Sequence, residues 1–363
     1  MIAVGTISQA LLYFFFATLI GSFILSVVPN THRPGISEPK SALMIACGGI
    51  AIFSFFPVWQ LVLYLAPDIG LAQTMQSVLF TFEVGKAWIF TYFLANVLFI
   101  YVIWFDYRNK PLYAYVGLAL TFIMILAIGW SSHASSYDRV WGFFSHTMHF
   151  TAVSVWVGIL FVVSWFSKDH INWSNFLKWF TPVAIICLVM TIISGFILMT
   201  WVVEFKEYTN SWMLPYGQIL LIKHLLIIPL LVYAMINGLF IKKKLKKDAQ
   251  FNPRPWAKVE SSIILLIFSA TAAMGQQSPP HETNVSYGEV SKLFTFIYQG
   301  QFQPGMNVEL GFSPTGFTLI VLAVLFIGLV IFSFIKKAPA IMSFFLSVFT
   351  VLCVYLSIIL SIN

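Results

Sequence analysis

Long apolar runs separated by short polar segments dominate the chain. Ten of these runs are about as long as the roughly 20 residues that a helix needs to cross a bilayer. They lie near residues 5–29, 41–66, 78–105, 112–131, 141–167, 176–203, 217–241, 256–275, 316–335 and 338–362. None shows the alternation of polar and apolar residues that is typical of a membrane β-barrel. The pattern therefore predicts an all-α polytopic membrane helix bundle of about ten transmembrane helices.

The composition supports a membrane location and excludes several other classes of protein. Of the 363 residues, 59% are hydrophobic and only 9% are charged, whereas a soluble domain has about 25% charged residues. The net charge of +7 comes from a few short loops, so we expect the lipid bilayer and no nucleic acid as a partner. The three cysteines are scattered through apolar segments and predict neither a disulfide framework nor a thiolate cluster. The first apolar run is long enough to span and has no basic residue before it, so we expect no cleavable signal.

Basic residues are distributed unequally between the loops. Loops that follow odd-numbered runs hold fourteen Lys and Arg residues, seven of them within residues 242–258, whereas loops that follow even-numbered runs hold three. Because cytoplasmic loops are enriched in Lys and Arg, the odd loops are predicted to be cytoplasmic and both termini to lie outside. Residues 276–315, rich in Gly, Pro, Gln and Asn, would then form a long extracytoplasmic loop, too short for a separate domain.

Histidines gather at one predicted depth. With this topology, His133 lies at the outer rim, His146, His149 and His224 lie in the outer third of their runs, and His281 follows just outside. Ionisable groups inside a membrane usually face the bundle interior or a cavity and mark function. Each histidine alone could instead serve as a capping or hydrogen-bonding residue near the interface. The shared depth favours a site that opens to the outside.

The residue types indicate what such a site could bind. Imidazole suits copper, zinc, iron and nickel, and thioether sulfur favours Cu(I). His146 and His149 are three residues apart and project from one face of a helix. Met148, Met199 and Met274 lie at a similar depth, although methionine is more often a packing residue. Copper is therefore the first candidate, while haem b held by His149 and His224 or a proton relay through His and Glu stays open.

Other polar residues near the same depth have supporting roles at most. Glu83 and Lys86 stand at i and i+3, so the spacing predicts an ion pair on one helix. Lys223 has no acidic partner on its own helix. Trp156 lies one stripe below His149 and would line a path beneath the site, and small residues such as Ser154 and Gly158 allow close helix packing.

Several short motifs, in this order along the chain, resemble those of the CopD family of bacterial copper-transport membrane proteins. They are VGKAW (84–88), SSHAS (131–135), HFTAVSVWVGIL (149–160), YGQILLIKHLLI (216–227) with Lys223 at the lysine position and Asn237 downstream, and VESSIILLIFSATAAMGQQSPP (259–280). Ser132 stands where the family usually has glycine. The resemblance covers roughly residues 1–280, an eight-helix CopD-like membrane domain, which leaves 281–315 as the extracytoplasmic loop and 316–363 as two additional transmembrane helices.

The resemblance implies copper handling at the bacterial plasma membrane, usually as import from outside. Members of the family often work with a soluble extracytoplasmic copper-binding partner or carry such a domain fused at the C-terminus. In this chain residues 281–363 are instead predicted to form a loop and two more spans, which leaves the soluble partner open. The combined hypothesis is a copper transporter, not an enzyme, whose Cu(I) or Cu(II) site uses the four histidines at residues 133, 146, 149 and 224. The chain has no Walker-type segment, so direct ATP hydrolysis is not expected. A b-type haem oxidoreductase and an assembly factor for copper enzymes are the alternatives.

Overall fold

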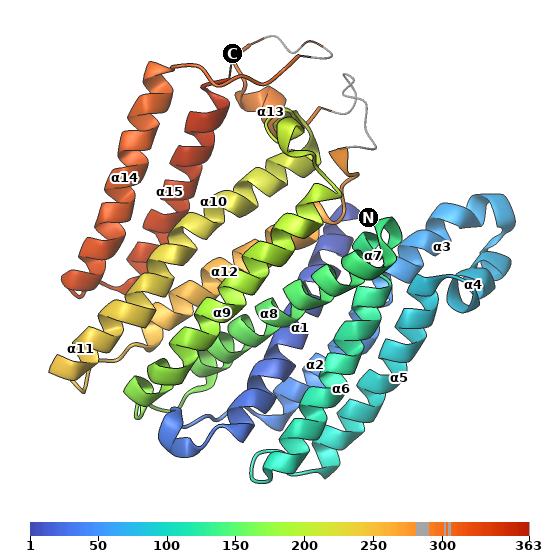
Figure 1. Cartoon of the computed structure of the whole chain (residues 1–363), viewed down its shortest axis with the longest axis horizontal. Helices are drawn as coiled ribbons and strands as arrows, with labels where there is room; N and C mark the ends of the chain where they lie inside the picture. Colours follow the sequence, from blue (N-terminus) through green and yellow to red (C-terminus); the bar gives the residue numbers. More distant parts are fainter. Residues whose placement is uncertain (281–289, 301–302, 304–305, 363) are drawn as a thin grey trace. The chain divides into compact units, whose positions relative to one another are not determined.

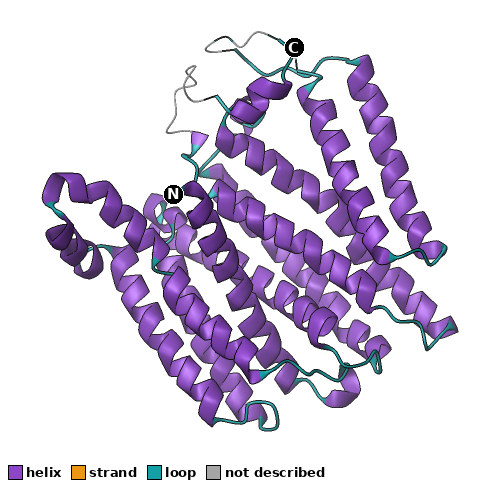
Figure 2. Ribbon diagram, turned by 180° about the vertical axis from the view of Figure 1, so that it is seen from behind, coloured by secondary structure: helices purple, strands orange, loops and turns teal. Residues whose placement is uncertain are grey.

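The computed structural model describes residues 1–280, 290–300, 303 and 306–362, and its regular structure is helical throughout (Figure 2). Among these described residues, ten helical segments are long and apolar enough to cross a membrane. Within the described residues the only β-type pairing consists of two isolated bridges, with no strand. Apart from the groups at their ends, helices satisfy their backbone hydrogen bonds internally, which is what a lipid environment demands. The prediction of an all-α, multi-pass membrane protein is confirmed.

The chain divides into two compact units, residues 3–201 and residues 202–363. The helices of the first unit are α1 (Ile2–Val27), α2 (Lys40–Phe53), α3 (Phe56–Ile69), α4 (Leu71–Phe80), α5 (Glu83–Trp104), α6 (Pro111–Trp130), α7 (His133–Tyr137), α8 (Arg139–Phe166) and α9 (Trp173–Thr200), with a 3₁₀ turn at Asn30–His32 (Figure 1). The second unit holds two 3₁₀ turns (Phe205–Glu207 and Asn210–Met213), α10 (Pro215–Met235), a π-helical turn (Ile236–Phe240), α11 (Ile241–Lys247), α12 (Arg254–Met274), α13 (Lys292–Ile297), α14 (Pro314–Ile335) and α15 (Ala340–Ile359).

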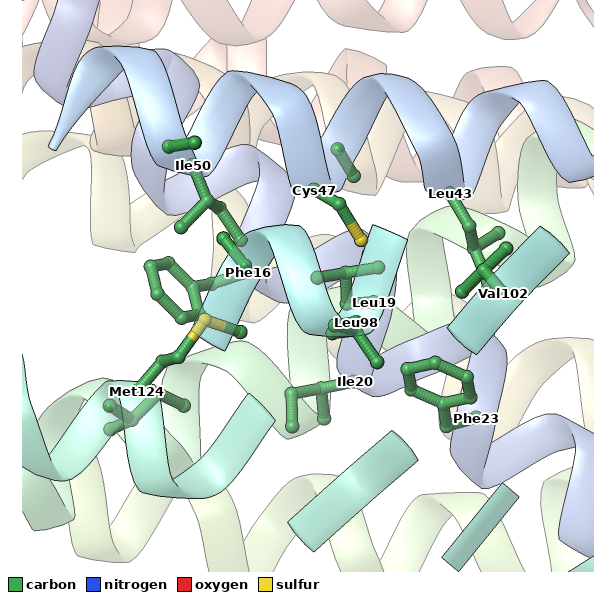
Figure 3. Close-up of a cluster of buried hydrophobic side chains, with 14 of the residues drawn as sticks. Phe16, Leu19, Ile20, Phe23, Leu43, Cys47, Ile50, Leu98, Val102 and Met124 are labelled. Carbon is green, nitrogen blue, oxygen red and sulfur yellow. The ribbon is translucent and has the colours of Figure 1, made fainter. Parts of the chain in front are cut away.

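Five helices, α1, α2, α5, α6 and α8, contribute buried side chains to the main hydrophobic core of the first unit. Phe16, Leu19 and Phe23 of α1 are fully buried against side chains of α2, α5 and α6. Figure 3 shows the α1 residues between Leu43, Cys47 and Ile50 on one side and Leu98, Val102 and Met124 around them. Because lipid is as apolar as these side chains, the core is held by close packing rather than by the hydrophobic effect alone.

The second predicted span is interrupted. α2 ends at Phe53 and α3 begins at Phe56, with Pro57 in its first turn. Proline has no N–H and its ring clashes with the preceding turn, so the first helix cannot run through it unbroken. Gly70, at φ 87°, then turns the chain into α4, a separate helix that packs on α3. The third span consequently begins at Glu83 rather than near residue 78.

α8 approaches α1 at a pair of glycines. A Cβ atom built on Gly158 would lie 2.0 Å from the Ala17 carbonyl oxygen, and one built on Gly21 would lie 2.1 Å from the Gly158 carbonyl carbon. Ser154, one turn earlier on α8, is also buried. The predicted close helix packing is thus confirmed at Gly158, where α1 is the partner.

In the second unit α15 packs against α10 and α12. The hydroxyl of Tyr233 on α10 lies 2.9 Å from the hydroxyls of both Ser343 and Ser347 on α15. The π-helical turn follows α10 and contains Asn237. The Nδ2 group of Asn237 donates a hydrogen bond to the Glu260 carboxylate of α12 at 2.6 Å. α15 is therefore joined to its unit by buried polar contacts as well as by apolar packing.

We expect Gly158→Ala to destabilise the protein, because the added methyl group would meet the backbone of α1 and only a shift of the helix could relieve the overlap. The loss should be about 1–3 kcal/mol, measured as a fall in the thermal unfolding midpoint of the purified protein in detergent. Gly48→Ala on α2 is the matched control, since nothing lies within 4 Å of a Cβ there. Equal midpoints for the two variants would contradict the proposed role of the glycine crossing.

Candidate metal site on helix α8

Two capping residues define where α7 and α8 begin. The Asp138 carboxylate accepts hydrogen bonds from the backbone N–H groups of Val140 (3.0 Å) and Trp141 (2.9 Å), so α8 starts at Arg139. Ser132 caps α7 in the same way, accepting from the Ser135 N–H at 3.3 Å. Both caps satisfy N–H groups that a helix start leaves without intrahelical partners. They fix the positions of the histidines that follow.

His133 and His146 lie near each other. A Cβ atom on Gly142 would be 2.0 Å from the Ala134 carbonyl oxygen, so α7 lies directly against the first turns of α8. In this arrangement His133, the first residue of α7, is close enough to His146 for the two rings to interact electrostatically. Two of the four predicted histidine ligands therefore lie at the same end of the first unit, one on α7 and one on α8.

The His146 ring is enclosed on α8. Its Nδ1 atom is buried and has no hydrogen-bond partner among the described residues. The ring makes an edge contact with Phe150 at 6.3 Å between centroids, and Phe150 packs on Tyr13 of α1 at 5.5 Å. A buried nitrogen without a partner is costly, so this atom is suited to a water or an ion.

His149 is held by α9. Its Nδ1 lies 3.1 Å from the Ser194 hydroxyl, and that hydroxyl donates to the Met190 carbonyl oxygen at 2.6 Å. Because the serine proton is used in the bond to Met190, the serine oxygen accepts from Nδ1–H of the imidazole. This tautomer places the ring's lone pair on Nε2. Metal-binding histidines are oriented in the same way, by donating their other N–H to a neighbouring group.

The residues around this histidine are mostly apolar. A Cβ on Gly195 would lie 3.5 Å from His149 Cε1, an ordinary contact distance, so the ring lies against α9. Trp156 is 5% exposed and its backbone contacts the thiol of Cys187. Met148 on α8 and Met199 at the end of α9 are half-buried.

Glu83 connects the ends of three helices of the first unit. Its carboxylate accepts a hydrogen bond from Trp130 Nε1 of α6 at 2.7 Å, and it lies 3.6 Å from the Lys86 ammonium and 3.8 Å from the Arg139 guanidinium of α8. The Arg139 guanidinium also stacks 3.8 Å over the Trp130 ring. The predicted pair between residues 83 and 86 is confirmed, and it is one part of a larger structural contact at exposed helix ends.

The second unit contains the remaining predicted residues. The Tyr208 hydroxyl lies 2.7 Å from Nδ1 of His224 on α10, and burial raises the pKa of Tyr208, which keeps the phenol protonated. A phenol that donates to Nδ1 would leave Nε2 protonated and unable to bind a metal, whereas one that accepts would leave Nε2 as a ligand. Lys223 and Met274 are half-buried on α10 and α12. His281 lies outside the described residues.

Sequence reasoning found the histidines but missed the groups that orient them. Within the described ranges, no three His, Cys, Asp or Glu side chains are grouped so as to hold a metal ion. The polar partners are instead hydroxyl groups, Ser194 for His149 and Tyr208 for His224. A small polar residue in an apolar run, as in IISGF, was a weak signal for Ser194. Tyr208 lies in a loop and gave none.

Fold and site together define a multi-pass helical membrane protein with imidazole and thioether groups in its apolar helices. Residues 174–274 match the family model described as copper resistance protein D, CopD. The match confirms the predicted resemblance over this segment and supports a CopD-family copper resistance protein. The segment contains Ser194, Lys223 and His224. Comparison with curated proteins and with solved structures gave no match.

We expect the imidazole of His149 to carry its proton on Nδ1, because Ser194 accepts from that nitrogen. The ¹⁵N spectra of histidine-labelled protein distinguish the two tautomers. Ser194→Ala should lower the population of the Nδ1–H form, since its acceptor is lost. Ser154→Ala, which removes a buried α8 hydroxyl with no hydrogen-bond partner among the described residues, should leave the His149 signals unchanged. A His149 ring that is Nε2–H in the unaltered protein would refute the assignment.

Proposed function

We propose that this protein transports copper across the bacterial plasma membrane, from the outside inward, through a histidine site near the outer ends of its helices. The match to the copper resistance family supports copper as the transported ion. The inward direction and the outer position follow from the loop charges and from the resemblance. Copper is here the substrate, so the histidines are its binding groups during passage rather than the ligands of a resident cofactor.

The observation that carries the proposal is the hydrogen-bonded chain from His149 through Ser194 to the Met190 carbonyl. It presents one imidazole nitrogen as an acceptor with a defined orientation, in a region of apolar residues. A ring oriented beforehand loses less entropy when it binds an ion, and its basicity is raised by the bond at the other nitrogen. His149 is therefore the principal ligand of the proposed site.

His146 and His133 complete the part of the site on the first unit. The buried Nδ1 of His146 has no partner among the described residues, which suits a metal ligand three residues from His149. His133 interacts with it electrostatically, and two imidazoles that share an ion are both stabilised in their neutral form. His224, the fourth histidine predicted from the sequence, belongs to the second unit, where its Nδ1 lies 2.7 Å from the Tyr208 hydroxyl.

The proposal also assigns roles to three methionines, to His281 and to Trp156. Met148, Met199 and Met274 offer thioether sulfur, a ligand that favours Cu(I) over harder ions. His281 would capture the ion from a soluble copper-binding partner before it enters. Trp156 would line the path below His149.

His149→Ala should remove stoichiometric copper binding from the purified protein, because it deletes the oriented ligand. Metal analysis after dialysis measures this directly. His32→Ala is the matched control, since His32 is exposed and bonded to its neighbour Thr31 in the loop after α1. Unchanged binding in His149→Ala would remove this residue from the site. A Soret band with stoichiometric iron in the unaltered protein would instead establish a b-type haem protein.

Cells that produce the unaltered protein should accumulate more copper than cells that produce His149→Ala, because the proposed direction is inward. Whole-cell copper content at matched protein levels is the measurement, with His32→Ala expected to behave like the unaltered chain. Lower copper content in cells that produce the unaltered protein would overturn import and indicate export.

Ser194→Ala should weaken copper binding by about 10–100-fold without abolishing it, as expected for the loss of a group that orients a ligand. A competition titration with a copper chelator measures the affinity. Ser154→Ala is again the control. An affinity equal to that of the unaltered protein would show that the serine contact does not serve metal binding.

A further inference from the structure

A polar cavity of about 340 Å³ lies at the end of the first unit where α1, α5 and α8 finish. Its walls come from the last turns of α1 and from three loops, which follow α1, α5 and α8. All three loops were predicted to be cytoplasmic from their basic residues. The cavity lies in a different part of the chain from the histidines of α7 and α8.

Backbone contacts hold the loops around the cavity in place. Gly35 accepts a hydrogen bond from the Lys168 N–H at 2.7 Å, and the Ser37 N–H donates to the Phe166 carbonyl oxygen at 2.8 Å. The Trp179 side chain of α9 donates to the His32 carbonyl oxygen at 2.8 Å. The cavity is therefore formed by fixed main chain.

Three basic side chains line the cavity: Arg33, Arg108 and Lys168. Arg33 donates through Nε to the Val28 carbonyl oxygen at 3.0 Å, and Arg108 donates to the Glu38 carbonyl oxygen. These bonds are to neutral acceptors. None of the three side chains is ion-paired with a carboxylate among the residues that the structure describes. Burial lowers the pKa of Arg33, because its charge is partly removed from water, and the nearby Glu38 carboxylate only partly opposes this effect.

One acidic side chain lines the same cavity. Glu38 is 5% exposed, and its carboxylate accepts from the Ser22 hydroxyl at 3.3 Å. Burial raises its pKa against the opposing influence of Arg108, so its negative charge is disfavoured there. Asp169, beside Gly35, offsets part of the positive charge. The three cations still exceed the two acids.

We infer that this cavity binds a phosphate group, carried either by an anionic lipid or by a phosphate ion from water. Two guanidinium groups and an ammonium group from three loops converge on a volume that side chains do not fill. Guanidinium groups bind phosphate oxygens through paired N–H donors. Basic pockets between membrane helices on the cytoplasmic side bind anionic lipid head groups, and the predicted topology places this cavity there.

The test compares ligand binding to the purified full-length chain in detergent. Arg33→Gln with Arg108→Gln removes two cations from the cavity, and Lys246→Gln with Lys247→Gln removes two exposed cations from α11 as the matched control. Lys168→Gln is a second cavity variant, because no hydrogen bond of its side chain contributes to the fold among the described residues. Native mass spectrometry measures binding of phosphatidylglycerol and of net-neutral phosphatidylcholine. Calorimetry measures binding of inorganic phosphate.

We expect phosphatidylglycerol to bind more tightly than phosphatidylcholine and its affinity to fall about tenfold or more in the double arginine variant. Lys168→Gln should also weaken binding, and the α11 variant should bind like the unaltered chain. If only inorganic phosphate binds with this dependence, the cavity takes a phosphate ion from water. The inference would be overturned if neither phosphatidylglycerol nor inorganic phosphate bound to the unaltered chain. It would also be overturned if the two double variants lost the same amount of affinity, or if Lys168→Gln bound as tightly as the unaltered chain.

Discussion

The close crossing of α1 and α8 at Gly21 and Gly158 is the constraint on which the rest of the first unit depends. At this point the two backbones touch, and no side chain fits between them. Helices in lipid gain little from burying apolar surface against one another, so contacts made possible by small residues determine which helices pair. α8 is fixed by this crossing to the helix that supplies much of the hydrophobic core. Its histidines are consequently presented from a rigid element rather than from a loop.

The helical architecture could be predicted from the sequence because lipid permits few alternatives. A chain whose apolar runs are long enough to span must form helices there, whatever its other preferences. The interruption at residues 54 and 55 was missed, although Pro57 was a local signal, because hydropathy averages over a helix break. Most of α4 fell between the second and third predicted spans and was not predicted as a helix. The short helix α7 is too brief to produce a periodic pattern.

The sequence predicts a shared depth for the histidines, but it could not predict their partners. Depth depends on position along one helix, whereas a partner depends on how two helices are rotated toward each other. Ser194 faces His149 because α8 and α9 pack along their length, and no spacing within either segment encodes that rotation. The pair of Glu83 and Lys86 was predictable because both residues lie on one helix. Trp130 and Arg139, which complete that contact, come from two others.

The tautomer imposed on His149 bears on how the membrane voltage would act on a bound ion. A ring held as Nδ1–H is a neutral ligand, as are thioethers and the other imidazoles when they bind metal. A copper ion in such surroundings keeps its full charge while it crosses. A potential that is negative inside then favours inward movement by about 2.3 kcal/mol per elementary charge for each 100 mV. A neutral coordination sphere would thus couple passage of the ion to the voltage without a nucleotide.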